Sequence, residues 1–284
     1  MSNDPTVGRT RASGKEQFYT QKDTAKILTS KMITLLGEES LSRNWIEPAG
    51  GTGAFIDSLM GLGITAEQIE SFDIEPKHEL VKHGDFLSQD FSRDDYLAIT
   101  NPPFGRNNKL SVPFFNKLAK HCTHIGFIVP KSWRKWSVQD KLDKSFHLIH
   151  DRELQINYVD DTGQPINNSS MLKTVFQIWE KRDYERESVQ IEDRGYLKKV
   201  SREEATVNFT AYGRNVCKVE VRKPEDPPFA KHSLKLWLKV RDNEVLEALA
   251  QANFKQYYEN TAFIEALSWR EINAALNEWF DARY

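Results

Sequence analysis

The run Asn101-Pro102-Pro103-Phe104 ends an apolar stretch and combines residue types that can hold an amine. Proline fixes φ and has no N–H, so the run presents two acceptors, the Asn101 side-chain oxygen and the Pro102 carbonyl, in a stiff frame. An aromatic or amide amine is a poor nucleophile because its lone pair is delocalised, and two acceptors can take both of its N–H hydrogens. Phe104 can stack on the planar group that carries the amine. Asn101 is neutral, so we expect positioning and polarisation rather than general-base catalysis. A strand that simply ends in a Pro-Pro turn is the competing interpretation.

A glycine-rich turn lies upstream, in the sequence EPAGGTGAF over Glu47–Phe55. Glycines let a backbone approach a ligand closely, and the N-terminus of a following helix offers free N–H groups. The turn lacks the Gly-Lys-Ser/Thr ending of a P-loop and differs from G-x-G-x-x-G. Because Glu47 precedes it, the turn suits a cationic ligand better than a pyrophosphate. An ordinary strand-to-helix turn is the alternative.

Acidic residues follow the next two elements. Asp73 ends the second expected strand and lies 20 residues after Gly53. An acid at this place in an open α/β sheet can bind ribose hydroxyls. Glu75, two residues further on, competes for that role. Asp85 and Phe86 follow a third short element and could bind an adenine amino group and cover its ring. Each acid taken alone could equally be a solvated strand end.

The elements that must position these residues alternate between strand and helix patterns. Short strands are expected before the glycine turn and at IESFDIEP, YLAITNPPF, HIGFIVPKSW and KTVFQIWEK, with a further short element at KHGDFL, and helices at DTAKILTSKMITLL, VPFFNKLAKHC and WSVQDKLDKSFHLIHDREL. Asp23 or Thr24 could cap the first helix. This order predicts an α/β fold with a doubly wound, mostly parallel, Rossmann-like sheet.

The pattern changes after about Arg182. A helix or turn followed by strands is expected over VSREEATVNFTAYGRNVCKVEV, and another strand at HSLKLWLKV after a Pro-rich loop. Helices follow at DNEVLEALAQANF and SWREINAALNEWF, the last with a Ser268–Glu271 capping box. We therefore expect a flexible tail over 1–16, a catalytic domain over 17–181 and a small α+β region over 182–284. This last region is interpreted either as a target-recognition subdomain or as a cap that solvates the fold.

Composition narrows the setting. The 284 residues carry a net charge of -2, so a nucleic-acid surface must be a local patch. Cys122 and Cys217 fit neither a disulfide framework nor a zinc site, which predicts a reducing, cytoplasmic compartment and no metal. No run approaches the roughly 18 apolar residues of a membrane span, and no sequence feature defines the oligomeric state.

Taken in order, EPAGGTGAF, DIEP, GDFL and NPPF resemble the motifs of Class I S-adenosylmethionine-dependent methyltransferases, in particular those that modify N6 of adenine. Gln17-Phe18-Tyr19-Thr20 is similar to the FYTP element that such DNA enzymes carry upstream, with Gln21 in place of the proline. The resemblance covers about residues 17–181. It implies S-adenosylmethionine as cofactor and a bacterial, phage or viral setting such as restriction-modification.

The resemblance also implies roles for individual residues. Cofactor contacts would come from Phe18, Tyr19, Thr20, Glu47, Ala49, Gly51, Gly53 and Phe55, then Asp73 and Ile74 near the ribose, Asp85 and Phe86 near the adenine, and Asn101. Asn101, Pro102, Pro103 and Phe104 would form the catalytic run. Lys131, Ser132 and Trp133 would lie near the substrate mouth.

A basic stretch follows the catalytic run. Between Arg106 and Lys144 nine Lys/Arg stand against two Asp/Glu, a local charge of +7, and Trp133 and Trp136 are interleaved. Basic residues bind phosphates, and aromatic residues stack on bases. We therefore expect this stretch to bind nucleic acid, DNA rather than RNA. The alternative is that it forms a solvated helix face. The expected contacts are Arg106, Lys109, Lys131, Trp133, Arg134, Lys135, Arg214 and Lys218. An RNA adenine methyltransferase, a protein glutamine methyltransferase and a catalytically silent binding module are the alternative functions.

Overall fold

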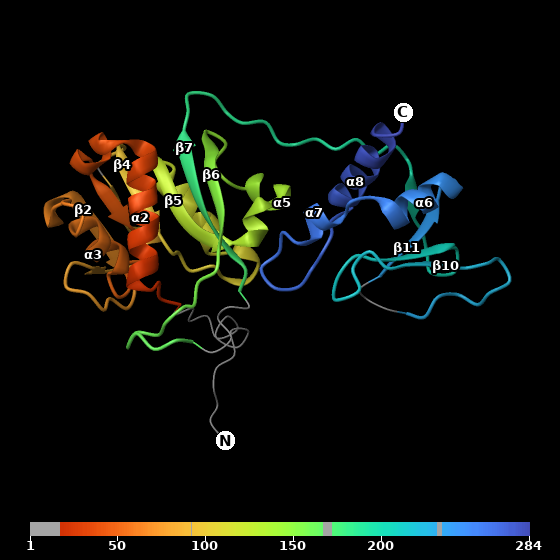
Figure 1. The fold of residues 1–284 in the computed structure, drawn as a ribbon, viewed down its shortest axis with the longest axis horizontal. Coiled ribbons are helices and arrows are strands. Elements are labelled where there is room, and N and C mark those ends of the chain that lie inside the picture. Colours follow the sequence, from red (N-terminus) through yellow and green to blue (C-terminus); the bar gives the residue numbers. More distant parts are fainter. Residues whose placement is uncertain (1–17, 92, 167–171, 232–234) are drawn as a thin grey trace, which may run out of the picture. The chain divides into compact units, whose positions relative to one another are not determined.

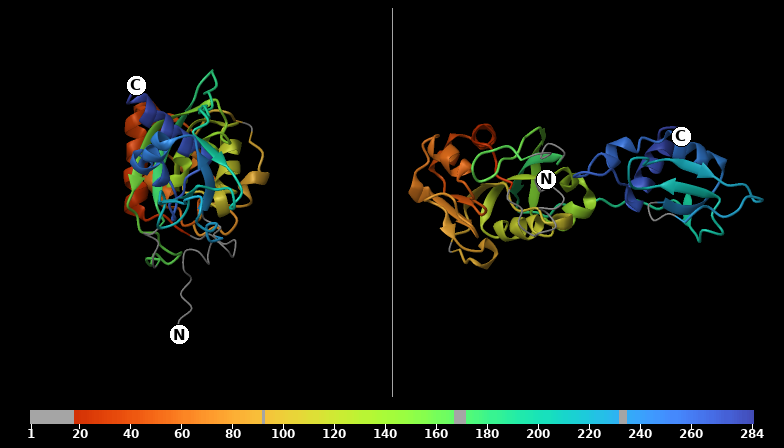
Figure 2. Two further views of the ribbon diagram at one scale, coloured as in Figure 1. Left: turned by 90° about the vertical axis from the view of Figure 1, so that its right-hand side faces the viewer. Right: turned by 90° about the horizontal axis from the view of Figure 1, so that it is seen from below.

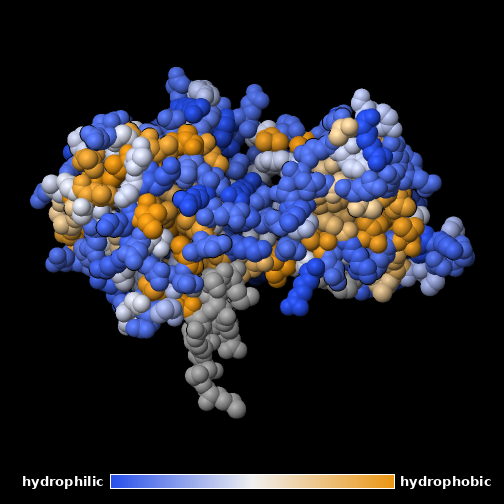
Figure 3. All heavy atoms as spheres, in the orientation of Figure 1, coloured by the Kyte–Doolittle hydropathy of each residue, from blue (hydrophilic) through white to orange (hydrophobic). Residues whose placement is uncertain are grey.

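A computed structural model describes residues 18–91, 93–166, 172–231 and 235–284, and these residues form two compact units. The units divide between Ser188 and Val189, beyond the expected boundary at Lys181, because residues up to Arg186 still contact the first unit. The expected tail over 1–16 and Gln17 lie outside the described residues. Within the described part of the chain, no helix has both the length and the apolar character to cross a membrane. The face drawn in Figure 3 is mainly hydrophilic, with separate apolar patches in both units.

The first unit is built on a seven-stranded sheet with the order β3-β2-β1-β4-β5-β7-β6. β7 runs antiparallel to its neighbours β5 and β6, and the remaining pairs are parallel. The strands are β1 (Trp45–Glu47), β2 (Ile69–Asp73), β3 (Lys82–His83), β4 (Tyr96–Thr100), β5 (Cys122–Pro130), β6 (Phe146–Leu154) and β7 (Thr174–Lys181). This sheet confirms the predicted doubly wound, mostly parallel architecture.

Helices cover both faces of this sheet, as the contacts of β5 show. Successive residues of a strand point to opposite faces. Gly126 faces α2 (Lys22–Leu36), where an added Cβ would lie 2.8 Å from the Met32 sulfur. Phe127 faces the opposite way and meets Phe115 of α4 (Ser111–Leu118), with the ring centroids 5.8 Å apart. α3 (Ala54–Met60) packs beside α2, and α5 (Trp136–Gln139) follows a 3-10 turn over Lys131–Arg134. Figure 1 shows α2 crossing the sheet.

Two expectations about local structure were wrong. α2 begins at Lys22 after Gln21, and no side chain caps it, so neither Asp23 nor Thr24 is the N-cap. The long helix expected after Trp136 ends at Gln139, and Phe146–Leu154 forms β6 instead. β6 is an edge strand with a register shift and partly exposed residues, so its sequence lacks the clean alternation that would have revealed a strand.

The second unit has a four-stranded antiparallel sheet with the order β10-β9-β11-β8. The strands are β8 (Leu197–Lys199), β9 (Val207–Thr210), β10 (Val219–Val221) and β11 (Lys235–Val240). α6 (Asn243–Gln251) and α8 (Trp269–Asp281) pack on one face of the sheet, and the short α7 (Lys255–Tyr258) lies between them in the chain (Figures 1 and 2). The Ser268–Glu271 capping box is present. These elements confirm the predicted α+β region.

Candidate functional site

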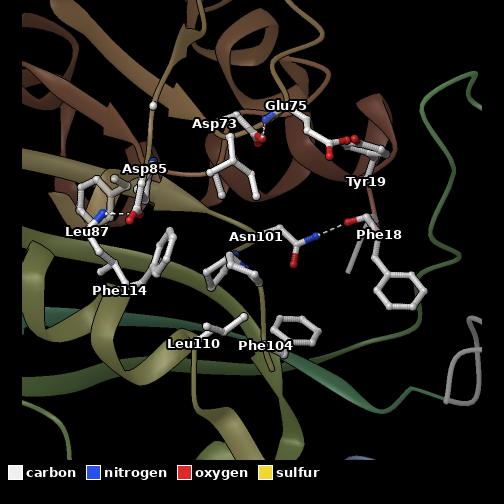
Figure 4. Close-up of a pocket in the computed structure, with 17 residues that line it drawn as sticks. Phe18, Tyr19, Asp73, Glu75, Asp85, Leu87, Asn101, Phe104, Leu110 and Phe114 are labelled. Carbon is white, nitrogen blue, oxygen red and sulfur yellow. Dashed lines mark hydrogen bonds between the residues drawn. The ribbon is translucent and has the colours of Figure 1, made fainter. Parts of the chain in front are cut away.

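A pocket of about 450 Å³ opens at the carboxyl ends of the central parallel strands. In such sheets the carboxyl edge is where ligands bind, and the volume falls in the range of about 300–1,000 Å³ typical of small-molecule sites. Asp73 reaches it from the end of β2, and Asn101 follows directly after β4. Figure 4 shows these side chains around one cavity. The fold therefore brings together residues that lie far apart in the sequence.

The side chain of Asn101 has a fixed orientation in this pocket. Its Nδ2 donates to the Phe18 carbonyl at 2.8 Å. Its Oδ1 is buried and has no hydrogen-bond partner among the described residues. A buried polar atom without a partner is costly, and native proteins keep few of them. Figure 4 shows Oδ1 directed away from Phe18 within the cavity, so the site presents an acceptor to which no described residue donates.

Phe18, Tyr19 and Thr20 form the second wall, and the loop between β6 and β7 holds them. Tyr19 and Val159 exchange both backbone hydrogen bonds, at 3.0 and 3.1 Å. The Phe18 ring lies against Tyr158, with the centroids 5.7 Å apart. Burial raises the pKa of Tyr19 to about 12, and the nearby carboxylates Asp73, Asp161 and Glu75 add to this shift. No periodic signal in the sequence marks this loop, and sequence reasoning missed its role.

The glycine turn is held from both sides by these neighbours. Gly51 has φ +48°, and a Cβ there would lie 2.6 Å from the Tyr19 ring. Its N–H donates to Asp73 Oδ2 at 2.9 Å. Gly53 has φ +79° and lies against the ring of His78, which leaves no room for a side chain. The turn therefore requires glycine at both positions, because of positive φ and of close approach.

Glu47 is almost completely buried beside a second, small hollow of about 30 Å³ next to the main pocket. Its Oε1 accepts from the Ala49 N–H at 3.1 Å. Burial raises the pKa of Glu47 to about 8, against the opposing effects of the Thr100 hydroxyl and the Ala49 N–H. The hydroxyl of Thr20, which also lines the hollow, is buried without a partner among the described residues. The hollow thus offers a carboxyl group and a hydroxyl to a small polar or cationic group.

The remaining acids support the backbone while lining the main pocket. Asp73 Oδ1 accepts from the Glu75 N–H at 2.8 Å, in addition to the bond from Gly51. Asp85 accepts from the Leu87 N–H at 2.9 Å and from the Ser88 hydroxyl at 3.1 Å. A carboxylate has about four acceptor sites, so each acid can still accept from a ligand. Glu75 also lines the pocket.

The structure brings most of the expected site residues to these two spaces. The main pocket is lined by Phe18, Tyr19, Ala49, Asp73, Ile74, Asp85, Phe86, Asn101, Pro102, Pro103 and Phe104, and the small hollow by Thr20, Glu47 and Phe55. Gly51 and Gly53 shape the turn without lining either space. The main pocket also uses Pro48, Gly84, Leu87, Leu110 and Phe114, which sequence reasoning missed because their role depends on apolar surface rather than chemistry. Phe104 is only 2% exposed, so it forms a wall and not an open lid.

Trp133 was expected to contact nucleic acid, and the structure contradicts this. The side chain is fully buried in the core, where its ring lies 5.6 Å from Phe115 and 5.8 Å from Phe127. Its indole N–H donates to the Ser111 hydroxyl at 3.3 Å. The 3-10 turn that follows β5 carries the ring back beneath α4, so it has no surface to offer a base.

The basic stretch also carries less available charge than its count of +7 suggested. Lys131 pairs with Glu153 at 2.7 Å, and Arg134 pairs with both Glu153 and Asp151. These two acids belong to β6 and lie outside the stretch that was counted. Lys131 and Arg134 are therefore not free phosphate ligands. Arg106 and Lys109 are exposed, Lys135 is half-buried, and Arg214 and Lys218 are exposed in the second unit, where Lys218 pairs with Glu220.

Neither a protein-family model nor a curated protein matches this sequence. Several solved structures are similar to part of this chain. A candidate RNA methyltransferase from Pyrococcus horikoshii is 18% identical and has a TM-score of 0.45, covering 58% of this chain and 87% of its own. A candidate Class I S-adenosylmethionine-dependent methyltransferase from Listeria monocytogenes is 15% identical, with a TM-score of 0.43 and coverages of 61% and 63%. The modification subunit of a candidate type I restriction enzyme from Vibrio vulnificus is 16% identical, with a TM-score of 0.39 and coverages of 61% and 46%.

The first unit has the Class I methyltransferase fold. Its strand order, with an antiparallel β7 between β5 and β6, carries this assignment. The identities and TM-scores transfer no activity. Within the described residues, no group of three His, Cys, Asp or Glu side chains could hold a metal ion.

Proposed function

We propose that this protein transfers a methyl group from S-adenosylmethionine to the N6 amine of adenine in DNA. The observation that carries the proposal is the buried Asn101 Oδ1, which faces the pocket while its amide nitrogen is committed to Phe18. No described residue donates to it, and an exocyclic amine is a donor that could.

The residues around the pocket fit the cofactor. S-adenosylmethionine, when bound, supplies an electrophilic methyl group on a sulfonium centre. Glu47 and Thr20 in the small hollow would hold its ammonium group, and Asp73 or Glu75 would accept from the ribose hydroxyls. Ile74 and Phe86 offer apolar surface to the adenine ring, and Asp85 an acceptor for its amino group.

Asn101, the Pro102 carbonyl and Phe104 would act on the target amine. Asn101 Oδ1 and the Pro102 carbonyl each accept one N–H, which orients the nitrogen lone pair and favours its localisation. The nitrogen forms the new bond to the methyl carbon, and the electrons of the broken carbon–sulfur bond stay on sulfur. One proton then leaves the nitrogen for water, since neither acceptor is a base. Phe104, a buried wall beside Asn101, would contact the face of the base.

A nucleic acid is proposed as the substrate because exposed cations follow directly after the amine site, and DNA is chosen over RNA because Phe18-Tyr19-Thr20 resembles the upstream element of DNA enzymes. Arg106 and Lys109 are solvent-exposed in the loop after Phe104, and such cations suit phosphates. An adenine within a duplex must leave the stack at a cost of a few kcal/mol, so a flipped or single-stranded base is the expected form.

The test is incubation of the full chain with the cofactor and mixed-sequence DNA, followed by mass spectrometry of the nucleosides. We expect N6-methyladenine, and its absence at high enzyme concentration would falsify the proposal. Parallel reactions contain an RNA of matched sequence and a glutamine-containing peptide. A faster reaction on the RNA, or methylglutamine without nucleic-acid methylation, would replace DNA adenine with that substrate.

A further inference from the structure

The sheet of the second unit has one face that its helices leave uncovered. Along β11 the residues alternate, and Leu236, Leu238 and Val240 belong to the core shared with α6 and α8. Lys235, Trp237 and Lys239 therefore point to the other side. Strand β11 thus presents a tryptophan between two lysines on what we call the outer face of this sheet.

The strand register extends this outer face across the neighbouring strands. Trp237 pairs with Asn208 of β9, and Asn208 pairs with Glu220 of β10. Lys239 pairs with Lys198 of β8. Paired residues of an antiparallel sheet share a face, so the outer face consists of Lys198, Asn208, Glu220, Lys235, Trp237 and Lys239.

Asn208, at the centre of this face, is buried, and its Nδ2 donates to Glu220 Oε2 at 3.2 Å. Asn208 Oδ1 and Trp237 Nε1 are both buried and have no hydrogen-bond partner within the described ranges. Trp237 as a whole is only half-buried. What the indole offers to solvent is therefore apolar ring surface, because its N–H is not accessible.

Charge on the outer face is positive around that ring. Glu220 is its one acid, and it is engaged by Lys235 at 2.6 Å and by Lys218 at 3.0 Å. Among the residues that the structure describes, Lys198 and Lys239 form no ion pair, although both lie near enough to Glu204 at the edge of the face to lower its pKa. Two exposed lysines, paired across β11 and β8, therefore lie together on one side of an apolar ring.

We propose that the outer face binds a single-stranded segment of DNA, with a base stacked on Trp237 and phosphates on Lys198 and Lys239. This inference rests on the proposed function only in taking DNA as the polymer. Aromatic side chains and a basic surround form a common platform for single strands, because each unpaired base exposes a flat face. A duplex buries those faces within its stack, and an acidic peptide would use the lysines but not the ring.

Fluorescence anisotropy of a labelled single-stranded DNA oligonucleotide with the full chain, without cofactor, tests the proposal. Trp237→Ala should weaken binding about tenfold, within the range for loss of one stacked base, whereas Trp237→Phe should stay within about threefold of wild type. The double variant Lys198→Glu/Lys239→Glu should lower the slope of log Kd against log salt by about 1.4, or about 0.7 for each phosphate that a lysine no longer neutralises. Lys26→Glu/Lys255→Glu changes the net charge equally on exposed helical positions and should leave the slope nearly unchanged.

The binding assay separates this proposal from the proposed function. If the protein methylates DNA but Trp237→Ala and the Lys198/Lys239 variant bind like wild type, the outer face is not a DNA site. If those variants lose binding but no N6-methyladenine forms, the outer face stands and the proposed activity fails. Tighter, Trp237-dependent binding of an RNA oligonucleotide of the same sequence would overturn the assignment to DNA.

Discussion

The Asn101 amide nitrogen donates to the Phe18 carbonyl at 2.8 Å, across 83 residues of sequence. This bond joins the run after β4 to the segment before α2, and it determines which end of the amide faces the pocket. Since the nitrogen is committed, the oxygen is left as an acceptor. An amide that rotated freely would present a donor half of the time, which would repel an amine hydrogen.

Replacing Asn101 with alanine should remove this acceptor and the bond to Phe18, while the bonds between Tyr19 and Val159 still hold that segment. We expect Asn101→Ala to lower turnover at least about 100-fold, the usual scale for loss of one catalytic hydrogen bond. The dissociation constant for S-adenosylmethionine, measured by calorimetry, should change by less than about threefold. Asn116→Ala, at a half-buried position of α4 that lines neither space and whose amide also makes hydrogen bonds, is the control and should retain turnover. Equal losses of turnover and cofactor affinity in Asn101→Ala would mean that the residue is structural.

Asp73→Ala should have the opposite pattern, with weaker cofactor binding as its main effect. The carboxylate orders both the Gly51 and the Glu75 N–H groups, and it lines the main pocket. We expect the cofactor dissociation constant to rise at least about tenfold, equivalent to roughly one charge-assisted hydrogen bond. Glu75→Gln is the comparison. Unchanged affinity in Asp73→Ala, together with a loss in Glu75→Gln, would move the ribose contact to Glu75.

The chemistry-bearing turns could be predicted from the sequence, because local residue types determine them. The glycines over Gly51–Gly53 and the prolines at Pro102 and Pro103 restrict the backbone directly, and the apolar strands before them place both turns at one sheet edge. The same reasoning placed Asn101 and Asp73 in one pocket.

The sequence predictions that failed concern features that depend on contacts between distant segments. The acids that neutralise Lys131 and Arg134 come from β6, an edge strand whose sequence favours a helix. The support of Tyr19 by Val159 depends on an irregular loop. Local periodicity carries no information about either, because tertiary pairing determines them.

Trp133 provides a stability test of its corrected role. A fully buried tryptophan replaced by alanine leaves a cavity, so Trp133→Ala should lower the free energy of unfolding by about 3–5 kcal/mol. Urea denaturation followed by circular dichroism measures this. Lys135→Ala, two residues away and half-buried, should cost less than about 1.5 kcal/mol. A Trp133→Ala protein of unchanged stability but weakened DNA binding would return this side chain to the nucleic-acid surface.

The raised pKa of Glu47 makes cofactor binding depend on pH. Burial raises the pKa of Glu47 to about 8, so the group is protonated in the free protein at pH 6.5. Hydrogen bonds from Thr100 and Ala49 oppose this shift, and the charge of Asp73 adds to it. An ammonium group in the small hollow favours the carboxylate, so binding should release a proton. Apparent affinity should therefore increase with pH, by up to about tenfold per unit, from about 5.5 to 7.5, where a free amino group stays mostly protonated.

Calorimetry in two buffers of different ionisation enthalpy counts that proton. At pH 6.5 the wild type should release close to one proton per cofactor bound, and Glu47→Gln should bind more weakly and release none. Glu67→Gln, an exposed acid in the same unit, should behave like wild type. The unfolding free energy gives an independent check, because a carboxyl whose folded pKa lies above its unfolded value favours the folded state less as pH rises from about 4.5 to 8. Over that interval the unfolding free energy of Glu47→Gln should decrease less than that of the wild type. Identical slopes of unfolding free energy against pH, or no proton released by the wild type, would show that Glu47 stays ionised and does not control binding.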